Sequence, residues 1–137
     1  MKVVLDTNIF VMSFSRRSPY HEIFKAIVEG RYTLVVSHEI LLEYEEIMTI
    51  KYGIDATKLF LDLLEELPNV EYLHRFFHFH LLKDADDDKF IDVAFQSNAQ
   101  YLVSEDKGFK ILKRIKFPKI TVIRINDFMK IIEDLKS

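Results

Sequence analysis

Short apolar runs rich in β-branched residues alternate with longer amphipathic stretches along this chain. The short runs are typical of buried strands and lie at 2–5, 32–36, 70–73, 101–103 and 120–125. Apolar residues that recur every three or four positions predict helices at 19–29, 38–51, 55–66, 86–98, 107–115 and 126–135. Strands that alternate with helices predict an α/β fold, a parallel sheet covered by helices on both faces.

Residues 74–84, with the sequence HRFFHFHLLKD, fit neither pattern clearly. Aromatic residues and histidines alternate there, which is compatible with a short strand or with an irregular loop. The three histidines of this segment raise the question of a zinc site: His74, His78 and His80. Because no cysteine accompanies them, histidines that face solvent or form hydrogen bonds are the simpler interpretation.

The length and composition of the chain predict one compact domain over residues 1–137. Of 137 residues 49% are hydrophobic, which is enough for a proper core, and no repeat or linker divides the sequence. The formal net charge of −3 gives the molecule no overall basic field for collecting nucleic acid. The chain has no cysteine, which excludes disulfides and thiolate metal ligands.

The sequence predicts a cytoplasmic protein that does not enter a membrane. Only three apolar residues separate Lys2 from Asp6, so the first residues do not resemble a signal peptide. No apolar run approaches the roughly 18 residues that a membrane-spanning helix needs.

Two of the predicted strands run directly into acidic residues. The first is followed by L-D-T-N, which contains Asp6, and the fourth by V-S-E-D, which ends on Asp106. Parallel sheets bind ligands outside the carboxyl ends of their strands, so neighbouring first and fourth strands would bring both acids into one crevice. The alternative is that each acid only caps the helix after it.

Two predicted helices add further acids. On the helix at 38–51, Glu43 lies on the flank of the apolar arc, whereas Glu39, Glu45 and Glu46 lie further toward solvent. An inward carboxylate is unfavourable unless it is paired, protonated or bound to a cation, and a buried hydrogen-bonded glutamate is the simpler alternative.

The helix at 86–98 begins in the cluster D-A-D-D-D-K-F. Acids in a first turn favour the helix dipole, and that explains most of them. Counted back from the apolar face of the helix, Asp87 projects toward the centre of that face, Asp86 lies at its edge and Asp88 is turned away. Dihedral angles at a helix start are uncertain, so Asp88 remains the alternative to Asp87.

The candidate site therefore consists of Asp6, Glu43, Asp87 and Asp106. Four carboxylates in one crevice need a compensating charge. Oxygen ligands without cysteine favour Mg²⁺ or Mn²⁺ over zinc. Such a cluster can activate water and stabilise the charge that develops on a phosphodiester, so a metal-dependent nuclease is the leading class.

Four short motifs, in this order and spacing, resemble the PIN domain: V-L-D-T-N, S-x-E-I-L-x-E, D-x-D-D-D-K-F and Y-L-V-S-E-D. The resemblance is strongest to the small prokaryotic VapC-type proteins, the toxin half of toxin-antitoxin pairs. It assigns the four family acids to Asp6, Glu43, Asp87 and Asp106, with Ser104 where the family often has Thr.

The resemblance implies a three-layer α/β/α fold with a five-stranded parallel sheet of order 3-2-1-4-5. It also implies Mg²⁺ or Mn²⁺ as cofactor and endoribonuclease activity that leaves a 3′-hydroxyl and a 5′-phosphate. An RNA substrate, a cognate antitoxin and a homodimer are the implied partners.

Basic residues follow Asp106 at intervals of three or four positions: Lys107, Lys110, Lys113 and Arg114. They form either a face that holds phosphates or an ordinary solvated helix face.

Other functions remain as alternatives. A receiver-type phosphoacceptor domain is disfavoured, because Asp6 stands alone after the first strand and Asn126, not lysine, follows the fifth. An RNA-processing nuclease outside a toxin-antitoxin system would use the same acids. A non-catalytic, metal-dependent binding module also stays open.

Overall fold

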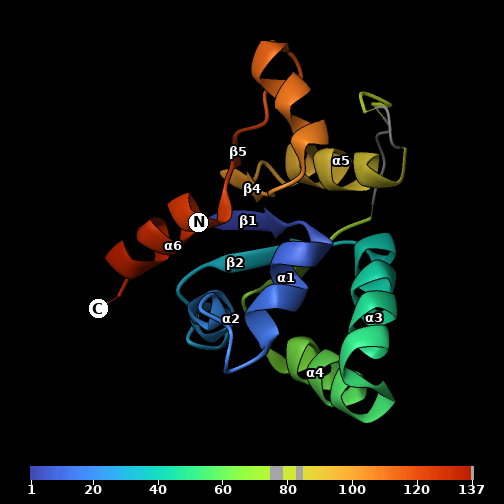
Figure 1. The fold of residues 1–137 in the computed structure, drawn as a ribbon. Helices are drawn as coiled ribbons and strands as arrows, with labels where there is room; N and C mark the ends of the chain where they lie inside the picture. The colour runs from blue at the N-terminus through green and yellow to red at the C-terminus, as the bar shows by residue number, and fades with distance from the viewer. Residues whose placement is uncertain (75–78, 83–84, 137) are drawn as a thin grey trace.

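The computed structural model of the chain describes residues 1–74, 79–82 and 85–136. Within these residues one parallel sheet has the strand order β3-β2-β1-β4-β5 (Figure 1). Its strands are β1 (Lys2–Leu5), β2 (Thr33–Val36), β3 (Val70–Tyr72), β4 (Tyr101–Val103) and β5 (Val122–Ile123). In the register of the sheet, Val3 lies between Leu34 of β2 and Tyr101 of β4. The predicted fold class and strand order are therefore confirmed.

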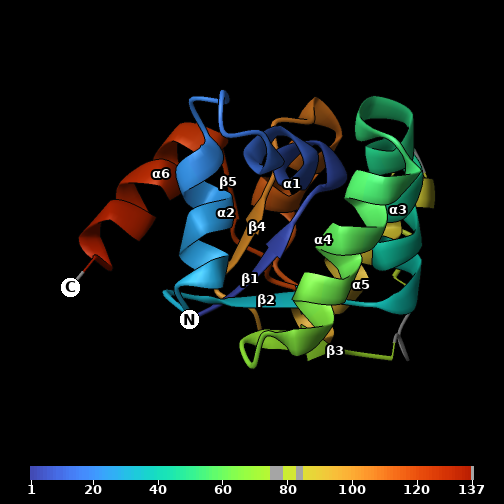
Figure 2. The ribbon, with the colours of Figure 1, turned by 90° about the horizontal axis from the view of Figure 1, so that it is seen from below.

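Helices cover both faces of the sheet (Figures 1 and 2). α5 packs against β1 and β4 on one side, whereas α1 and α2 lie on the other, where α3 and α4 extend this layer. The described helices are α1 (Thr7–Phe14), α2 (His21–Val28), α3 (His38–Tyr52), α4 (Ile54–Glu66), α5 (Asp88–Gln96) and α6 (Ile125–Asp134), with the 3-10 helices η1 (Ala85–Asp87) and η2 (Lys107–Arg114).

Local sequence explains where α3 begins and ends. The Ser37 hydroxyl accepts a hydrogen bond from the backbone N–H of Ile40 at 3.2 Å and caps α3. Gly53 ends α3 with φ +92°, a conformation that favours glycine. The helix α1, however, does not follow from the sequence pattern, because its apolar residues continue the run of β1 and hide the change of period.

Aromatic residues join α1 to α3 and α4 in the core. The rings of Phe10 and Tyr44 stack with centroids 4.0 Å apart, and Phe60 meets Phe10 edge-on at 5.0 Å. The Tyr44 hydroxyl donates a hydrogen bond to the carbonyl oxygen of Leu5, at 2.5 Å. This bond fixes α3 against the carboxyl end of β1, where Asp6 follows.

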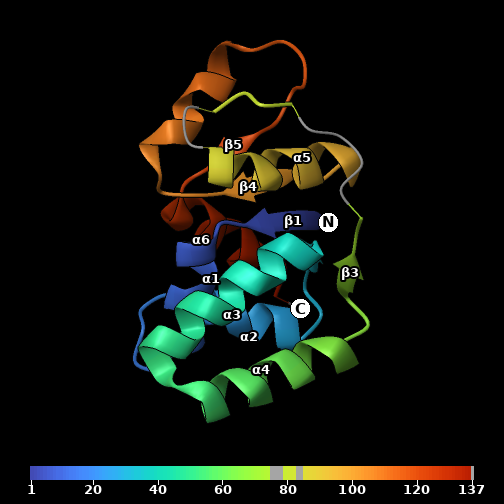
Figure 3. The ribbon, with the colours of Figure 1, turned by 90° about the vertical axis from the view of Figure 1, so that its right-hand side faces the viewer.

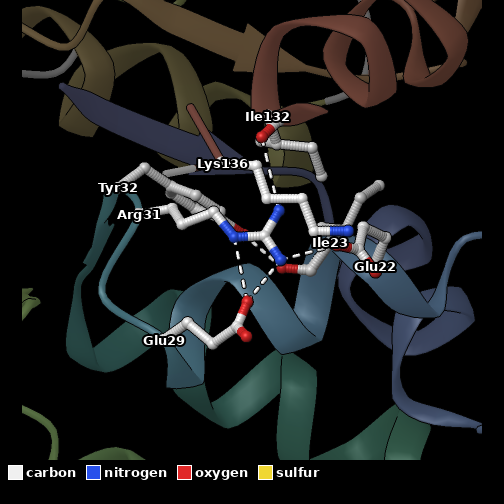
Figure 4. A network of polar contacts seen from close by, with 7 residues as sticks. All are labelled: Glu22, Ile23, Glu29, Arg31, Tyr32, Ile132 and Lys136. Atoms are coloured by element: carbon white, nitrogen blue, oxygen red, sulfur yellow. Dashed lines mark hydrogen bonds and ion pairs between the residues drawn. The ribbon is translucent and has the colours of Figure 1, made fainter. Parts of the chain in front are cut away.

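A buried arginine connects α6 to α2 through the polar contacts drawn in Figure 4. The side chain of Arg31 is 6% exposed and pairs with both Glu22 and Glu29. Its Nη1 donates to the carbonyl oxygen of Ile132 in α6 at 3.3 Å, and Lys136 lies 3.6 Å from Glu22. The C-terminal helix is thus held by charge as well as by its apolar face.

η2 and the loop that follows it rise beyond α5, at the top of Figure 3. Among the residues that the structure describes, none of the helices is sufficiently long and apolar to cross a membrane.

Candidate acidic active site

Asp6 lies at the carboxyl end of β1 and is only 7% exposed. Its backbone N–H continues the β1–β4 ladder to the carbonyl oxygen of Val103, at 3.0 Å. The Ser104 hydroxyl donates a hydrogen bond to Asp6 Oδ2 at 2.7 Å. The Asp6 side chain makes no capping hydrogen bond to α1, so the helix-cap interpretation does not explain this residue.

The pKa of Asp6 is raised above its ordinary value of 3.8. Burial is the largest cause, and the negative charges of Glu43 and Asp106 act in the same direction. Hydrogen bonds from the Ser104 hydroxyl and the Thr7 backbone oppose them without cancelling them. The folded protein therefore keeps a buried carboxylate among like charges, which is the arrangement that a cation relieves.

Glu43 points inward from α3, as the helical pattern predicts. Its side chain is 28% exposed, whereas Glu39, Glu45 and Glu46 are exposed. The Thr7 hydroxyl donates a hydrogen bond to Glu43 Oε2, and the Lys89 ammonium lies 2.9 Å from Oε1. Glu43 is thus a paired, half-buried carboxylate beside Asp6.

Asp106 differs from Asp6, because it is exposed and does cap a helix. Its Oδ1 accepts a hydrogen bond from the Gly108 backbone at 2.8 Å, at the start of η2. The Asp106 N–H donates to the Ser104 hydroxyl at 3.0 Å. Ser104 consequently connects Asp6 and Asp106 through two hydrogen bonds.

The neighbouring Glu105 has a structural role. It accepts hydrogen bonds from the Ile125 N–H and the Arg124 guanidinium, each at 2.8 Å. Burial opposes the charge of Glu105, but these two partners outweigh burial and lower its pKa. The end of β4 is therefore followed by two acids with different contacts. Glu105 bonds to the start of α6, whereas Asp106 bonds to Ser104.

The acids that open α5 are not arranged as the helical count predicts. Asp88 is 4% exposed and its Oδ1 accepts a hydrogen bond from the Leu82 N–H at 2.9 Å, so its predicted orientation away from the buried face is wrong. Asp87 is half-buried and Asp86 is exposed. The count fails for Asp88 because the first two turns of α5 are buried on every side, from Asp88 to Ala94, so the direction of a side chain does not decide its exposure there. The choice of Asp87 as the third acid stays a prediction.

Lys89 is the functional candidate that sequence analysis missed. It is 8% exposed, and its ammonium contacts Glu43 and the carbonyl oxygen of Asp86. It also lies 5.1 Å from the ring centroid of Phe90. The only sequence signal is a single base within the acidic run, which by itself does not distinguish a buried lysine from a solvated one.

The donor set of this site fits a hard divalent cation. Asp6, Glu43 and Asp106 offer only oxygen ligands, and after burial the negative charges of Glu43 and Asp106 also raise the pKa of Asp6. Within 1–74, 79–82 and 85–136, however, no group of three acidic or histidine side chains stands ready to hold a metal ion. His74 and His80 are within this range, and His78 lies outside the described residues.

A larger hollow of about 720 Å³ lies away from the acids, between α1, α2 and α4. Its lining is mostly apolar and contains no acid, with Phe14, Phe24 and Leu59 among its residues. Leu59 is 74% exposed, so this face of α4 is not covered by the chain. The polar groups of the hollow include His21, Arg16 and Lys25 but no carboxylate, so the acids near Asp6 remain the candidate active site.

The parallel sheet of order 3-2-1-4-5, with Asp6 after β1 and Asp106 after β4, defines an α/β protein with acids at the carboxyl edge of its sheet. The chain belongs to the PIN domain family, whose sequence model matches residues 2–108. A search among curated proteins gave no match. The resemblance noted from the motifs is thereby confirmed at the level of the family.

Three solved structures share the fold at low sequence identity. VapBC2 from Rickettsia felis, bound to a DNA fragment from its promoter, is 19% identical over 90% of this chain and 98% of that chain, with a TM-score of 0.61. VapC20 from Mycobacterium tuberculosis, a toxin that cleaves the sarcin-ricin loop, is 14% identical over 87% and 98%, with a TM-score of 0.56. The PIN domain endonuclease Utp24 is 18% identical over 90% and 84%, with a TM-score of 0.51.

Proposed function

We propose that this protein is a metal-dependent endoribonuclease of the VapC type, the toxin of a toxin-antitoxin pair. The observation that carries the proposal is the state of Asp6, a buried carboxylate whose pKa is raised by burial and by Glu43 and Asp106. A group with this environment at the ligand-binding edge of an α/β sheet is a candidate for catalysis.

Asp6, Glu43 and Asp106, together with Asp87, are the residues that would hold Mg²⁺ or Mn²⁺. A divalent cation supplies an activated water and neutralises charge on the phosphodiester. Ser104 orients Asp6 and Asp106 through its two hydrogen bonds, and Thr7 orients Glu43. Asp6 and Thr7 lie where β1 passes into α1. Glu43 lies on α3, and Ser104 and Asp106 follow β4, which supports one shared site for these side chains.

The names of similar structures support RNA as the substrate and a protein as the regulator. VapC20 is described as a toxin that cleaves the sarcin-ricin loop, and VapBC2 is a toxin-antitoxin complex. We accordingly propose an RNA substrate, a cognate antitoxin, a homodimer and a cytoplasmic location for a single PIN-like domain over residues 1–137. The uncovered apolar hollow beside α4 supports a protein partner.

The test is cleavage of a labelled structured RNA by purified protein with Mn²⁺ or Mg²⁺, compared with EDTA and with the variants Asp6→Asn and Glu43→Gln. Glu45→Gln is the matched control, since Glu45 lies on the same helix α3 and faces solvent. We expect cleavage by wild type and Glu45→Gln alone. Cleavage that survives Asp6→Asn would refute the assignment of the site.

The similarity to Utp24 supports a second candidate, an RNA-processing endonuclease outside a toxin-antitoxin system. Expression in a bacterial host distinguishes the two. A toxin arrests growth unless a short neighbouring gene is co-expressed, whereas a processing enzyme does not need such a partner. Absence of metal-dependent cleavage over a panel of RNAs and single-stranded DNA would instead favour a non-catalytic binding module.

A further inference from the structure

One segment of the chain has a charge opposite to that of the rest. Residues 107–119, the basic arm, comprise η2 and the loop beyond it. The basic arm contains six of the 19 basic residues and none of the 22 acidic ones, so the remainder has 13 basic residues, 22 acidic ones and a formal charge of −9. The six cations are Lys107, Lys110, Lys113, Arg114, Lys116 and Lys119. A net charge of −3 therefore conceals a strongly basic surface.

The conformation of η2 places three of these cations in a row. The sequence K-G-F-K-I-L-K-R-I has a period of three, and a 3-10 helix has three residues per turn, so side chains three positions apart eclipse. Phe109 and Leu112 are 1% and 3% exposed and anchor the helix. Lys107, Lys110 and Lys113 consequently share one exposed edge, separated by roughly 6 Å of helix rise.

The cations of the basic arm are not neutralised by the protein. All six are exposed, and the ion pairs within the described part of the chain include none of them. By contrast, Arg124, which follows β5, pairs with Glu105 at 2.6 Å. A row of unpaired cations is the arrangement that binds a polyanion, because each contact with a phosphate releases a counterion.

The basic arm adjoins the acidic site. Lys107, Lys110 and Lys113 line a hollow of about 90 Å³ that also contains Ser104 and Asp106. Ser104 is the residue that donates to Asp6, and Asp106 caps η2 itself. A strand that follows the row of lysines therefore reaches the carboxylates without crossing the rest of the surface.

The basic arm also carries an exposed aromatic ring. Phe117 is 71% exposed, and it is held by edge-on contacts with Phe95 and Phe79, whose ring centroids lie 5.3 and 6.1 Å away. Exposed aromatic rings beside cations are platforms on which unpaired bases stack. Bases inside a duplex are already stacked on each other, so the ring favours a single strand.

We propose that the basic arm is a docking surface for single-stranded RNA, in which the row of lysines holds successive phosphates and Phe117 stacks on a base. This proposal rests on the proposed function for the fate of the RNA, but binding can be measured without cleavage. An acidic segment of a partner protein could also pair with these lysines, but it has no base that stacks on Phe117. The exposed ring therefore favours RNA over an acidic protein segment.

The test uses the full chain with Asp6→Asn and EDTA, so that RNA stays intact. Fluorescence anisotropy with a labelled 12-nucleotide single-stranded RNA gives Kd between 50 and 200 mM salt. The double variant Lys110→Glu with Lys113→Glu reverses two charges of the row. Its control is Lys58→Glu with Lys130→Glu, which makes the same charge change at exposed positions on α4 and α6.

We expect the arm variant to weaken binding at least tenfold, and to reduce the slope of log Kd against log salt by about 1.4, or about 0.7 for each lost phosphate contact. The control variant should stay within about twofold of its parent. Equal binding by the two double variants, with both folded by circular dichroism, would overturn the proposal.

The role of the ring is tested by Phe117→Ala, which leaves every charge in place. Because stacking on an aromatic ring is sequence-tolerant and strong, we expect roughly tenfold weaker binding of single-stranded RNA and little change for a duplex of the same length. An equal loss for both RNAs would overturn the single-strand assignment. If the basic arm binds an acidic peptide equally well with and without Phe117→Ala, and binds no RNA, the arm is a surface for a protein partner instead.

Failure of this proposal and failure of the proposed function give different results. Wild type that binds RNA through the basic arm but does not cleave any RNA with Mn²⁺ would refute the nuclease and support the arm. Wild type that cleaves RNA, with an arm variant that binds and cleaves equally well, would refute the arm and support the nuclease.

Discussion

Two clusters of charged side chains in this protein have opposite electrostatics. At the junction of α2 and α6, Arg31 meets two carboxylates and a carbonyl oxygen, and the hydrogen bond from Arg31 lowers the pKa of Glu22. At the carboxyl end of β1, the pKa of Asp6 is raised, because burial and two further acids disfavour its charge.

The difference separates a cluster of balanced charges from one in which carboxylates predominate. Burial opposes the charge of Arg31, yet hydrogen bonds to Glu22 and Glu29 outweigh it and raise the pKa of the guanidinium. In the Asp6 cluster, the buried Lys89 contacts Glu43 and not Asp6, as far as the described residues show. Charges that satisfy one another need no ligand, whereas an excess of one sign is ready for a cation or a substrate.

The largest expected effect is that of Asp6→Asn. We expect cleavage to fall by roughly 100-fold or more, beyond the 10- to 100-fold loss typical when a partner of a metal ligand is removed. Because the variant removes a buried charge and keeps an acceptor for Ser104, unfolding should become less favourable by about 1 kcal/mol. Urea unfolding and a cleavage assay together check this; an unstable variant would contradict the view of Asp6 as a strained carboxylate.

The Arg31 cluster should respond in the opposite way. Arg31→Met removes the partner of Glu22 and Glu29 and of the Ile132 carbonyl oxygen. We expect a loss of about 2–3 kcal/mol of stability. This is less than for a fully buried ion pair, because both carboxylates reach solvent. RNA cleavage at a temperature where the variant is folded should not change. Glu29→Gln is the control, with an expected loss of about 0.5 kcal/mol.

Lys89→Met tests whether the buried Lys89 ammonium mainly affects the stability of the fold or metal binding by the acidic cluster. Removal of a positive charge beside Glu43 should tighten Mn²⁺ binding several-fold, since like charges repel. Stability should fall by about 1–2 kcal/mol as Glu43 and the Asp86 carbonyl lose a donor. Isothermal titration calorimetry measures the first effect, and Lys89→Arg serves as the variant that retains the charge. Weaker Mn²⁺ binding by Lys89→Met would show that Lys89 mainly positions Glu43.

The smallest expected effect is the contrast in pH dependence between Glu22 and Asp6. The pKa of Glu22 lies below its ordinary value of 4.5, so its contribution to stability is present above pH 4.5 and is lost as the pH falls through the folded value. The raised pKa of Asp6 has the opposite sign, and protonation of this group favours the folded state.

We therefore expect Glu22→Gln to lose less stability than wild type when the pH falls below 4.5. The difference should be under about 1 kcal/mol, because Glu22 is partly exposed. Asp6→Asn should make the same loss steeper. Thermal melts in EDTA between pH 3 and pH 7 measure both slopes, and parallel curves for the two variants would contradict the comparison.

Much of this fold is predictable from local pattern. Val3, Val4 and Leu5 are fully buried, as a continuous apolar run in a parallel sheet requires. The inward position of Glu43 follows from the regular period of α3. Helix α1 is not predicted, because Ile9, Phe10 and Val11 are apolar like the strand before them.

The predicted exposure of Asp88 was wrong because the count assumes that one side of α5 faces solvent. Residues from Asp88 to Ala94 are all buried, so Asp88 is covered although a helical count turns it outward. The sequence also contains no sign that Asp106 caps η2 while Asp6 caps nothing, since both acids follow a strand in the same way.

Apart from α1, the sequence by itself determined which described segments form strands and helices and which acids stand at strand ends, because these depend on side chains a few positions apart. Only the tertiary structure decided which charges meet. Lys89 reaches Glu43 across 46 residues, and Arg31 reaches the carbonyl of Ile132 across 101. Such pairs depend on how α3 packs near α5 and how α6 packs on α2. The sequence alone therefore does not distinguish a charge that is neutralised from one that is left in excess.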